Sequence, residues 1–164
     1  MCGVVAVVGK LNASQLVLEG LKKLEYRGYD SAGIASTYKG KLQVVKSEGK
    51  LVKLIDKLNR FTDDKLYFDT SIALGHTRWA THGNISIENA HPLTSKNKIA
   101  VVHNGIIENY EVLRNQLISE GYEFKSQTDT EVLPHLFMKY IKLGNNLLQA
   151  GRLVLRDIKG AFAF

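Results

Sequence analysis

The sequence predicts a layered α/β or α+β sandwich, in which helices cover a sheet. Short β-branched apolar runs occur singly and in a hairpin, and stretches with helical spacing of apolar residues lie between them. No repeat or low-complexity tract interrupts this alternation. The chain has 164 residues, 45% of them hydrophobic and 23% charged, which is enough to bury a core in one domain or two small ones.

The N-terminal elements are a strand, a helix and a hairpin. Residues 4–8 are a β-branched apolar run closed by a glycine, which is typical of a strand buried on both faces. Ser14 is a candidate N-cap for a helix over 14–24, because leucines recur there at helical spacing. Apolar residues flank Lys39-Gly40, which predicts a hairpin over 34–46 with a tight turn.

The middle of the chain predicts a helix, two strands and a long loop. Leucine and isoleucine mark one apolar face of a short helix over 51–58. The apolar runs 72–74 and 99–102 indicate two buried strands. The polar stretch 79–97 between them is expected to be a loop, and loops of that length commonly carry function.

The C-terminal part predicts three helices and a last strand. The first helix ends at Gly121, a residue that favours helix ends. Thr128 and Glu131 have the spacing of a capping box before a helix over 132–141. A further helical stretch over about 146–156 leads into an apolar run that ends the chain.

Composition argues against several classes of protein. A single cysteine excludes an internal disulfide and a tetrathiolate metal site, so we expect a cytoplasmic protein. The apolar run 4–8 is too short to cross a bilayer and lacks the basic flank of a secretory signal, so no membrane partner is expected. The formal charge is +6, but the lysines are scattered and no basic-aromatic motif accompanies them. We therefore expect no nucleic-acid partner.

Motifs for cofactors and metals are also missing. Gly28 and Gly33 have the spacing of a phosphate loop, but Ile34-Ala35 stands where lysine and a hydroxyl residue are needed. The chain has no GxGxxG motif, and its histidines never form HExxH. We expect no cofactor and no metal. For His135, one helical turn after Glu131, the expected role is an exposed ion pair.

Cys2 is a candidate nucleophile because of its position. Removal of Met1 would leave one residue with both a thiol and a free α-amine. An α-amine titrates at about 7.7 to 8.0, so it is a base close to neutral pH. A nucleophile whose own amine accepts its proton is the N-terminal nucleophile arrangement. Taken alone, a single cysteine is more often a small buried hydrophobe, and only the neighbouring motifs favour catalysis.

Other residues fit an acyl-transfer site. Asn104 and Gly105 follow the strand over 99–102, so an amide side chain and a backbone N–H would leave the sheet edge together as oxyanion donors. Arg78 can grip a carboxylate, Trp79 can cover an apolar stem, and Asp129 can accept a substrate ammonium. The alternatives are a plain Asn-Gly turn, a surface arginine, a core tryptophan and a helix-dipole acid.

Six motifs resemble, in order, the signature of the class II glutamine amidotransferases. They are Met1-Cys2-Gly3, the run 25–33, the run 76–83, Asn89-Ala90-His91-Pro92, the run 103–110 and Thr128-Asp129-Thr130-Glu131. More narrowly, the chain resembles the glutaminase domain of the glutamine:fructose-6-phosphate amidotransferase branch, because the runs 25–30 and 79–81 differ from those of phosphoribosylpyrophosphate amidotransferases.

The resemblance implies roles for individual residues. Cys2 is the nucleophile and its freed amine the base, while Asn104 and Gly105 form the oxyanion hole. Arg78 binds the α-carboxylate of glutamine and Asp129 its α-ammonium. The residues that line or close the pocket are Trp79, Thr81 and His82, and those that support it are Arg27 and His91.

The implied fold is the four-layer αββα sandwich of the N-terminal nucleophile hydrolases. Residues 1–164 would be a glutaminase domain that is incomplete at its C-terminus, because the chain stops within the apolar run 160–164. The sugar isomerase domains of the branch are absent, and they are the expected partner. The full-length enzyme is expected to be a homo-oligomer.

The implied activity is hydrolysis of glutamine to glutamate and ammonia through a Cys2 thioester. The ammonia would convert fructose 6-phosphate to glucosamine 6-phosphate in hexosamine biosynthesis. Two alternatives remain open at this point. One is the same chemistry with another acceptor, such as phosphoribosylpyrophosphate, and the other is a noncatalytic module that binds glutamine or a partner protein.

Overall fold

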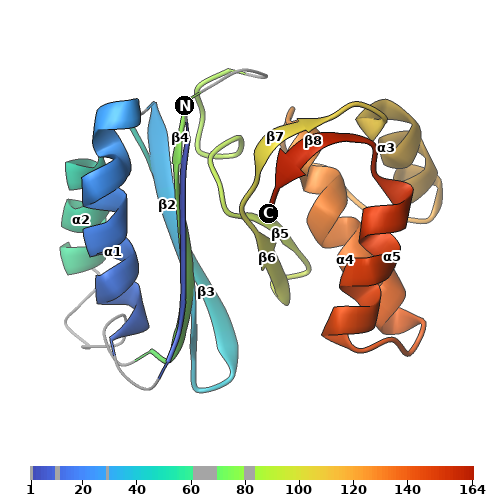
Figure 1. Cartoon of the computed structure of the whole chain (residues 1–164), viewed down its shortest axis with the longest axis horizontal. Coiled ribbons are helices and arrows are strands. Elements are labelled where there is room, and N and C mark those ends of the chain that lie inside the picture. The colour runs from blue at the N-terminus through green and yellow to red at the C-terminus, as the bar shows by residue number, and fades with distance from the viewer. Residues whose placement is uncertain (1, 10–11, 29, 61–69, 80–83) are drawn as a thin grey trace.

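The computed structural model describes residues 2–9, 12–28, 30–60, 70–79 and 84–164. Figure 1 shows four layers in succession: a pair of helices, a sheet, a set of short strands, and a second group of helices. The first two layers come from the N-terminal half of the chain and the other two from the C-terminal half. This order of layers confirms the α+β class and the αββα arrangement.

The first sheet consists of four antiparallel strands in the order β1-β4-β2-β3. They are β1 (Gly3–Val8), β2 (Ser31–Tyr38), β3 (Lys41–Glu48) and β4 (Ile72–Arg78). β2 and β3 form the predicted hairpin, and its turn residues Lys39 and Gly40 have φ of 46° and 74°. Two successive positive φ angles suit a two-residue hairpin because they match the twist of the flanking strands.

Helices α1 (Ala13–Leu24) and α2 (Leu51–Arg60) cover one face of this sheet (Figure 1). Both helices were predicted from the spacing of their leucines; Leu18 and Leu21 of α1 and all three leucines of α2 are buried, whereas Leu16 is 49% exposed. Apolar side chains three and four residues apart lie on one side of a helix, so they meet the sheet together. The core that results contains Ala13, Val17, Leu18, Leu21, Ala32, Ile34, Val45, Leu51, Leu54, Leu58 and Ala73.

β1 lies at the end of the strand order, and the expectation of a strand buried on both faces is therefore wrong. Val5 and Val7 pack against the core beneath α1, whereas the side chain of Val8 is 82% exposed. Successive side chains of a strand point to opposite faces, so only one face of β1 faces the helices. A short apolar run does not by itself distinguish a central strand from an edge strand.

The C-terminal half combines two small antiparallel sheets with three helices (Figure 1). β5 (Leu93–Ser95) pairs with β6 (Ile99–Val101), and β7 (Asn104–Ile107) pairs with β8 (Gly160–Ala163). The helices are α3 (Tyr110–Ser119), α4 (Val132–Lys142) and α5 (Leu147–Asp157). Ile107, Leu133 and Val154 are fully buried in the core that these elements share. β5 falls inside the stretch expected to be loop, which was too polar to predict a strand.

Ser14 is not the N-cap of α1, which corrects the prediction. The N-cap is Asn12, with a left-handed φ of 54° and no side-chain capping bond. Ser14 lies inside the first turn and is buried, and its hydroxyl oxygen lies 2.8 Å from Oγ1 of Thr70. This contact fastens the start of α1 to the residues just before β4.

The predicted capping box before α4 is also wrong. Thr128 makes no capping bond, and the Glu131 carboxylate instead accepts the backbone N–H groups of Lys125 and Ser126. His135 contacts this carboxylate at 3.8 Å, but both side chains are buried, so the expected exposed ion pair is a buried contact. A genuine capping box opens α5, where Asn146 and Gln149 bond reciprocally.

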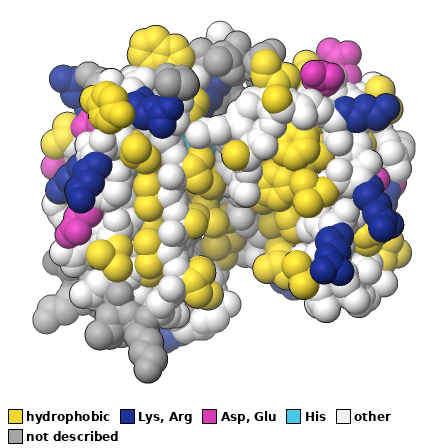
Figure 2. Space-filling model, in the orientation of Figure 1, with side chains coloured by type: hydrophobic (Ala, Val, Ile, Leu, Met, Phe, Trp, Pro, Cys, Tyr) yellow, Lys and Arg dark blue, Asp and Glu magenta, His cyan; other side chains and the backbone are white. Residues whose placement is uncertain are grey.

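Figure 2 shows a hollow between the sheet half and the helical half of the molecule, with hydrophobic side chains exposed on both sides of it. The bridging segment 84–92, which precedes β5, runs between the two halves (Figure 1). Among the described residues, no helix combines the length and the apolar character needed to cross a bilayer. The candidate site lies where the bridging segment meets the end of β4.

Candidate active site

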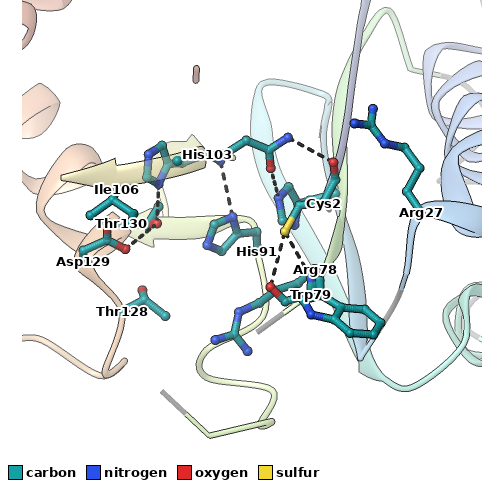
Figure 3. Close-up of a pocket in the computed structure, with 13 residues that line it drawn as sticks. Cys2, Arg27, Arg78, Trp79, His91, His103, Ile106, Thr128, Asp129 and Thr130 are labelled. Carbon is teal, nitrogen blue, oxygen red and sulfur yellow. Dashed lines mark hydrogen bonds between the residues drawn. The ribbon is translucent and has the colours of Figure 1, made fainter. Parts of the chain in front are cut away.

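Cys2 stands directly before β1, next to the end of β4. The strands pair with Gly3 opposite Thr77, so the residue before Gly3 lies beside the residues that follow Thr77. The backbone N–H of Trp79 donates to Cys2 Sγ at 3.1 Å, and Sγ lies 3.5 Å from the Trp79 carbonyl oxygen (Figure 3). Strand register thus brings the start of the chain to the motif that contains Arg78.

Asn104 reaches Cys2 from the other half of the molecule. It is the first residue of β7, and its Nδ2 donates to the backbone carbonyl of Cys2 at 3.2 Å. Its Oδ1 lies 2.9 Å from Nε2 of His76. An amide oxygen can only accept, so the imidazole is the donor of this second bond. The Asn104 side chain is therefore held at both ends beside the cysteine (Figure 3).

Gly105 follows Asn104 with a φ of +123°, in a region that side chains rarely adopt. A Cβ built there would lie 2.1 Å from the carbonyl oxygen of Ala161 on β8. Only glycine therefore permits β7 and β8 to pair at this point. Gly105 lines the same cavity as Cys2 and Asn104.

Arg78, the last residue of β4, is buried and already has partners. Its Nη1 lies 3.7 Å from Oδ1 of Asp30 and donates to the carbonyl of Asn84 at 3.4 Å. The carboxylate orients the guanidinium from one side. Asp30 belongs to a motif used for the resemblance, but no role was predicted for it.

Asp129 lies on the opposite wall of the cavity, in the short helix η2 (Asp129–Glu131). Its Oδ2 accepts the backbone N–H of Ile107 at 2.8 Å, and the Thr130 hydroxyl donates to its Oδ1 at 3.4 Å. The carboxylate thus anchors η2 to β7. Figure 3 shows Asp129 separated from Cys2 by the His91 and His103 side chains.

One cavity of about 510 Å³ contains every predicted site residue that the structure describes. These residues are Cys2, Arg27, Arg78, Trp79, His91, Asn104, Gly105 and Asp129. Thr81 and His82 lie outside the described residues, and their roles stay predictions. Residues that are up to 127 positions apart in the chain, such as Cys2 and Asp129, therefore line one cavity.

Buried histidines form one side of this cavity. The rings of His76 and His91 lie 4.3 Å apart between centroids, and those of His91 and His103 lie 6.5 Å apart. Nδ1 of His91 accepts the backbone N–H of His103, and Nδ1 of His103 lies 2.8 Å from the Thr130 hydroxyl oxygen. These bonds link the Cys2 side of the cavity to the Asp129 side.

Burial keeps these imidazoles neutral. It lowers the pKa of His76 to about 4 and holds the pKa of His91 well below its usual value. Burial also lowers the pKa of His103, and the Asp129 carboxylate opposes that effect. At pH 7 the charges on the described cavity wall are therefore those of Arg27, Arg78 and Asp129.

Five lining residues were missed as individual site residues although their motifs were noted, and the sequence offered a signal for two of them, His76 and His103. His76 and Arg78 alternate along β4 and so share a face, and His103 directly precedes Asn104. The alternation of His76 with Arg78 and the position of His103 next to Asn104 were the sequence signals that could have identified these two histidines. Ile106, Thr128 and Thr130 also line the cavity. No arrangement of His, Cys, Asp and Glu side chains suited to a metal ion is found among the described residues.

The fold, the N-terminal cysteine and the amide beside it define the class of protein. The chain belongs to the glutamine amidotransferase family, whose domain model matches residues 38–164. It is a class II amidotransferase, similar over nearly its whole length to the glutamine–fructose-6-phosphate aminotransferases (isomerizing).

Curated relatives with that name come from several organisms. The chain is 52% identical to the enzyme of Clostridium acetobutylicum over 164 residues, 48% to that of Thermosynechococcus vestitus over 167 residues and 47% to that of Pyrococcus horikoshii over 164 residues. Each match includes 99% of this chain and 26% or 27% of the relative. The chain thus spans about a quarter of the length of these relatives.

Solved structures support the same fold. A glutamine phosphoribosylpyrophosphate amidotransferase from B. subtilis, complexed with ADP and GMP, superposes with a TM-score of 0.79 at 32% identity. An allosteric regulatory enzyme of purine biosynthesis superposes with a TM-score of 0.80 at 31% identity. Each comparison covers 99% of this chain and 34% of the other. The N-terminal nucleophile fold expected from the motifs is confirmed.

Proposed function

We propose that this chain hydrolyses glutamine to glutamate and ammonia, with Cys2 as nucleophile. The observation that carries the proposal is the meeting of the Cys2 thiol and the Asn104 amide in one cavity, with guanidinium and carboxylate groups on its walls. Free glutamine carries one carboxylate, one ammonium and one carboxamide. The cavity offers a group of matching chemistry for each.

The first step is attack of the Cys2 sulfur on the carboxamide carbon of glutamine. The C–S bond forms as the carbonyl π bond opens, and the oxygen takes up the negative charge. Nδ2 of Asn104 and the backbone N–H of Gly105 donate to that oxygen. Collapse of the intermediate breaks the C–N bond, and the nitrogen leaves as ammonia after it receives a proton. Water then cleaves the thioester to give glutamate and the free thiol.

The base in this scheme is the α-amine of Cys2. Within the described residues, both hydrogen bonds of Sγ involve the backbone of Trp79, and no imidazole is hydrogen-bonded to the sulfur. A free α-amine titrates close to neutral pH and lies on the same residue. This role requires removal of Met1, because an acylated nitrogen is not a base.

Arg78 and Asp129 are proposed to bind the two charged groups of the substrate. The Arg78 guanidinium would take the α-carboxylate while Asp30 holds it in place. The Asp129 carboxylate would take the α-ammonium while the Ile107 N–H orients it. Trp79, Thr81 and His82 are proposed to line and close the site, with Arg27 and His91 as supports.

The proposed acceptor of the ammonia is fructose 6-phosphate, giving glucosamine 6-phosphate in hexosamine biosynthesis. The curated relatives that carry this activity in their name are 47% to 52% identical, whereas the phosphoribosylpyrophosphate amidotransferase is 32% identical. Residues 1–164 are proposed as the glutaminase part, and a sugar isomerase domain as its partner. The cytoplasmic location and the homo-oligomeric state stay predictions.

The test measures intact mass and glutamate release on the same sample of the full chain. We expect a mass without Met1 and release of glutamate and ammonia in equal amounts. The control is Cys2→Ala, which removes the nucleophile and leaves the cavity walls unchanged. A chain that lacks Met1, binds glutamine and releases no glutamate would be a binding module, and the proposal would be wrong.

A further inference from the structure

We propose that His76 is a positioning residue that fixes the orientation of the Asn104 amide. No role was predicted for His76, and it makes no hydrogen bond to Cys2. The inference rests on the proposed function, because it concerns the oxyanion donor of that reaction. Its consequence is that the rate of hydrolysis depends on a side chain that does not contact the substrate.

The geometry of the amide carries the argument. Asn104 Nδ2 donates to the Cys2 carbonyl at 3.2 Å, and Oδ1 faces Nε2 of His76 at 2.9 Å. Rotation of the amide by 180° would place Oδ1 toward the Cys2 carbonyl, where two acceptors oppose each other. It would also place Nδ2 toward the imidazole N–H, where two donors oppose each other. A proton on Nε2 therefore selects the orientation that points the N–H at Cys2.

His76 is well suited to hold this orientation. Its side chain is 1% exposed, on the strand that pairs with β1 at Val4 and with β2 at Gly33. The His91 ring packs on it at 4.3 Å, and burial disfavours its protonation. The donor is thus fixed by the sheet and not by a loop (Figure 3). Hydrogen-bond donors held in advance stabilise a developing oxyanion most effectively.

His91 belongs to the same cluster but has a different function. Its Nδ1 accepts the His103 N–H, so its proton is on Nε2 and it makes no hydrogen bond to Asn104. Gly33 lets it approach closely, since a Cβ there would lie 2.2 Å from the His91 carbonyl oxygen. His91 therefore supports the His76 ring by packing, whereas His76 is the imidazole that bonds to the amide directly.

The test compares two substitutions that differ in one donor. His76→Gln retains an N–H near the position of Nε2, and His76→Met has similar length without a donor. We expect His76→Met to lower kcat for glutamine about tenfold or more with KM changed about twofold or less, because the lost interaction is made mainly in the transition state. His76→Gln should retain kcat within about threefold.

Coupling to Asn104 separates positioning from a general structural effect. In an Asn104→Ala background, His76→Met should lower kcat by less than about twofold, because the amide it positions is gone. Iodoacetamide alkylates Cys2, the only cysteine of the chain, in a reaction that uses no oxyanion donor. The alkylation rate should therefore be the same in the wild type, His76→Met, Asn104→Ala and the double variant. Equal losses in both backgrounds, or equal rates for His76→Gln and His76→Met, would overturn the inference.

NMR tests the hydrogen bond between His76 and Asn104 without a measurement of enzyme activity. In wild-type protein labelled with ¹⁵N-histidine, we expect His76 as the neutral Nε2–H tautomer, and a proton on Nδ1 alone would overturn the inference even if His76→Met does not fold. The outcomes also separate the two proposals. A wild-type chain that releases no glutamate contradicts the proposed function, whereas a fully active His76→Met variant contradicts only the role of His76.

Discussion

Cys2 is held by backbone contacts, while the amide beside it is held by a side-chain network. The Trp79 N–H donates to the sulfur, whereas Asn104 is bonded to both the Cys2 carbonyl and His76. The proposed nucleophile and the proposed oxyanion donor are thus contacted by different parts of the chain. Because the Asn104 amide also bonds to the Cys2 carbonyl, substitutions at the two residues should be coupled.

Cys2→Ala should abolish glutamate release because it removes the only thiol of the chain, which is the proposed nucleophile. Glutamine binding should persist, since Arg78 and Asp129 are untouched. The measurement is glutamate release together with calorimetric titration of glutamine. Residual activity above the uncatalysed rate would contradict the assignment of the nucleophile.

Asn104→Ala should lower kcat by about 10² to 10³, the usual cost of an oxyanion donor, with a smaller effect on KM. The remaining Gly105 N–H accounts for the activity that is left. Steady-state kinetics with glutamine measure both constants. A loss of tenfold or less would place the oxyanion elsewhere in the cavity.

Asp129→Asn should raise KM for glutamine about tenfold, or about 1.4 kcal/mol, through loss of the charge that faces the α-ammonium. The fold should survive, because an amide oxygen can still accept the Ile107 N–H. The comparison substrate is the analogue of glutamine that lacks the α-amine, a five-carbon acid with a terminal carboxamide. Its KM should change little. Equal increases for both substrates would make Asp129 purely structural.

At the scale of secondary-structure elements, the residue that follows β4, Trp79, packs against the turn that precedes β2. Trp79 is 54% exposed, and its ring lies against Gly28, which has a φ of +116°. A Cβ on Gly28 would lie 2.2 Å from Cε3 of Trp79. The backbone of Trp79 also contacts the Cys2 sulfur, so the packing of this ring and the position of the nucleophile are linked.

Gly28→Ala should displace the Trp79 ring and lower kcat/KM for glutamine about tenfold or more. Trp79 is the only tryptophan of the chain, so its fluorescence spectrum reports the displacement directly. The matched control is Gly40→Ala, which also has a positive φ, of 74°, but no atom within 4 Å of the added Cβ. Equal effects of the two changes would mean that backbone strain, not ring packing, is responsible.

Across the whole molecule, buried neutral histidines connect the site to stability. His76 in the folded chain has a pKa of about 4, below the usual value of 6.5 that applies when the chain unfolds. Between these values the unfolded chain binds more protons, so acid favours unfolding. The free energy of unfolding should thus fall as the pH decreases from about 6.5 to about 4.

His76→Gln should flatten this pH dependence, by up to about 1.4 kcal/mol per pH unit, because it removes one histidine that must be buried uncharged. Urea unfolding at pH 7, 6 and 5 in both proteins gives the two slopes. The wild type serves as its own reference at pH 7, where the histidine is mostly neutral in both states. Identical slopes would show that His76 titrates normally in the folded chain.

Local patterns predicted nearly every element, and they failed where the outcome depends on neighbours. The helices over 14–24 and 132–141 and the hairpin around Lys39-Gly40 depend on periodicity and turn chemistry, which a short window contains. Ser14 and Glu131 instead bond to Thr70 and to the backbone at Lys125 and Ser126. Such tertiary partners cannot be read from cap spacing.

The candidate site likewise has features that the sequence predicts and features that only the structure shows. Cys2, Asn104 and Asp129 were recognisable from motifs, because their chemistry and their order along the chain are written in the residues. Their meeting in one cavity, the pairing of Arg78 with Asp30 and the bond from His76 to Asn104 depend on strand register and on packing between the two halves. Residue types and their spacing therefore defined the family and the elements. Only folding joined residues 102 positions apart, such as Cys2 and Asn104, because hydrogen bonds form between neighbours in space and not along the chain.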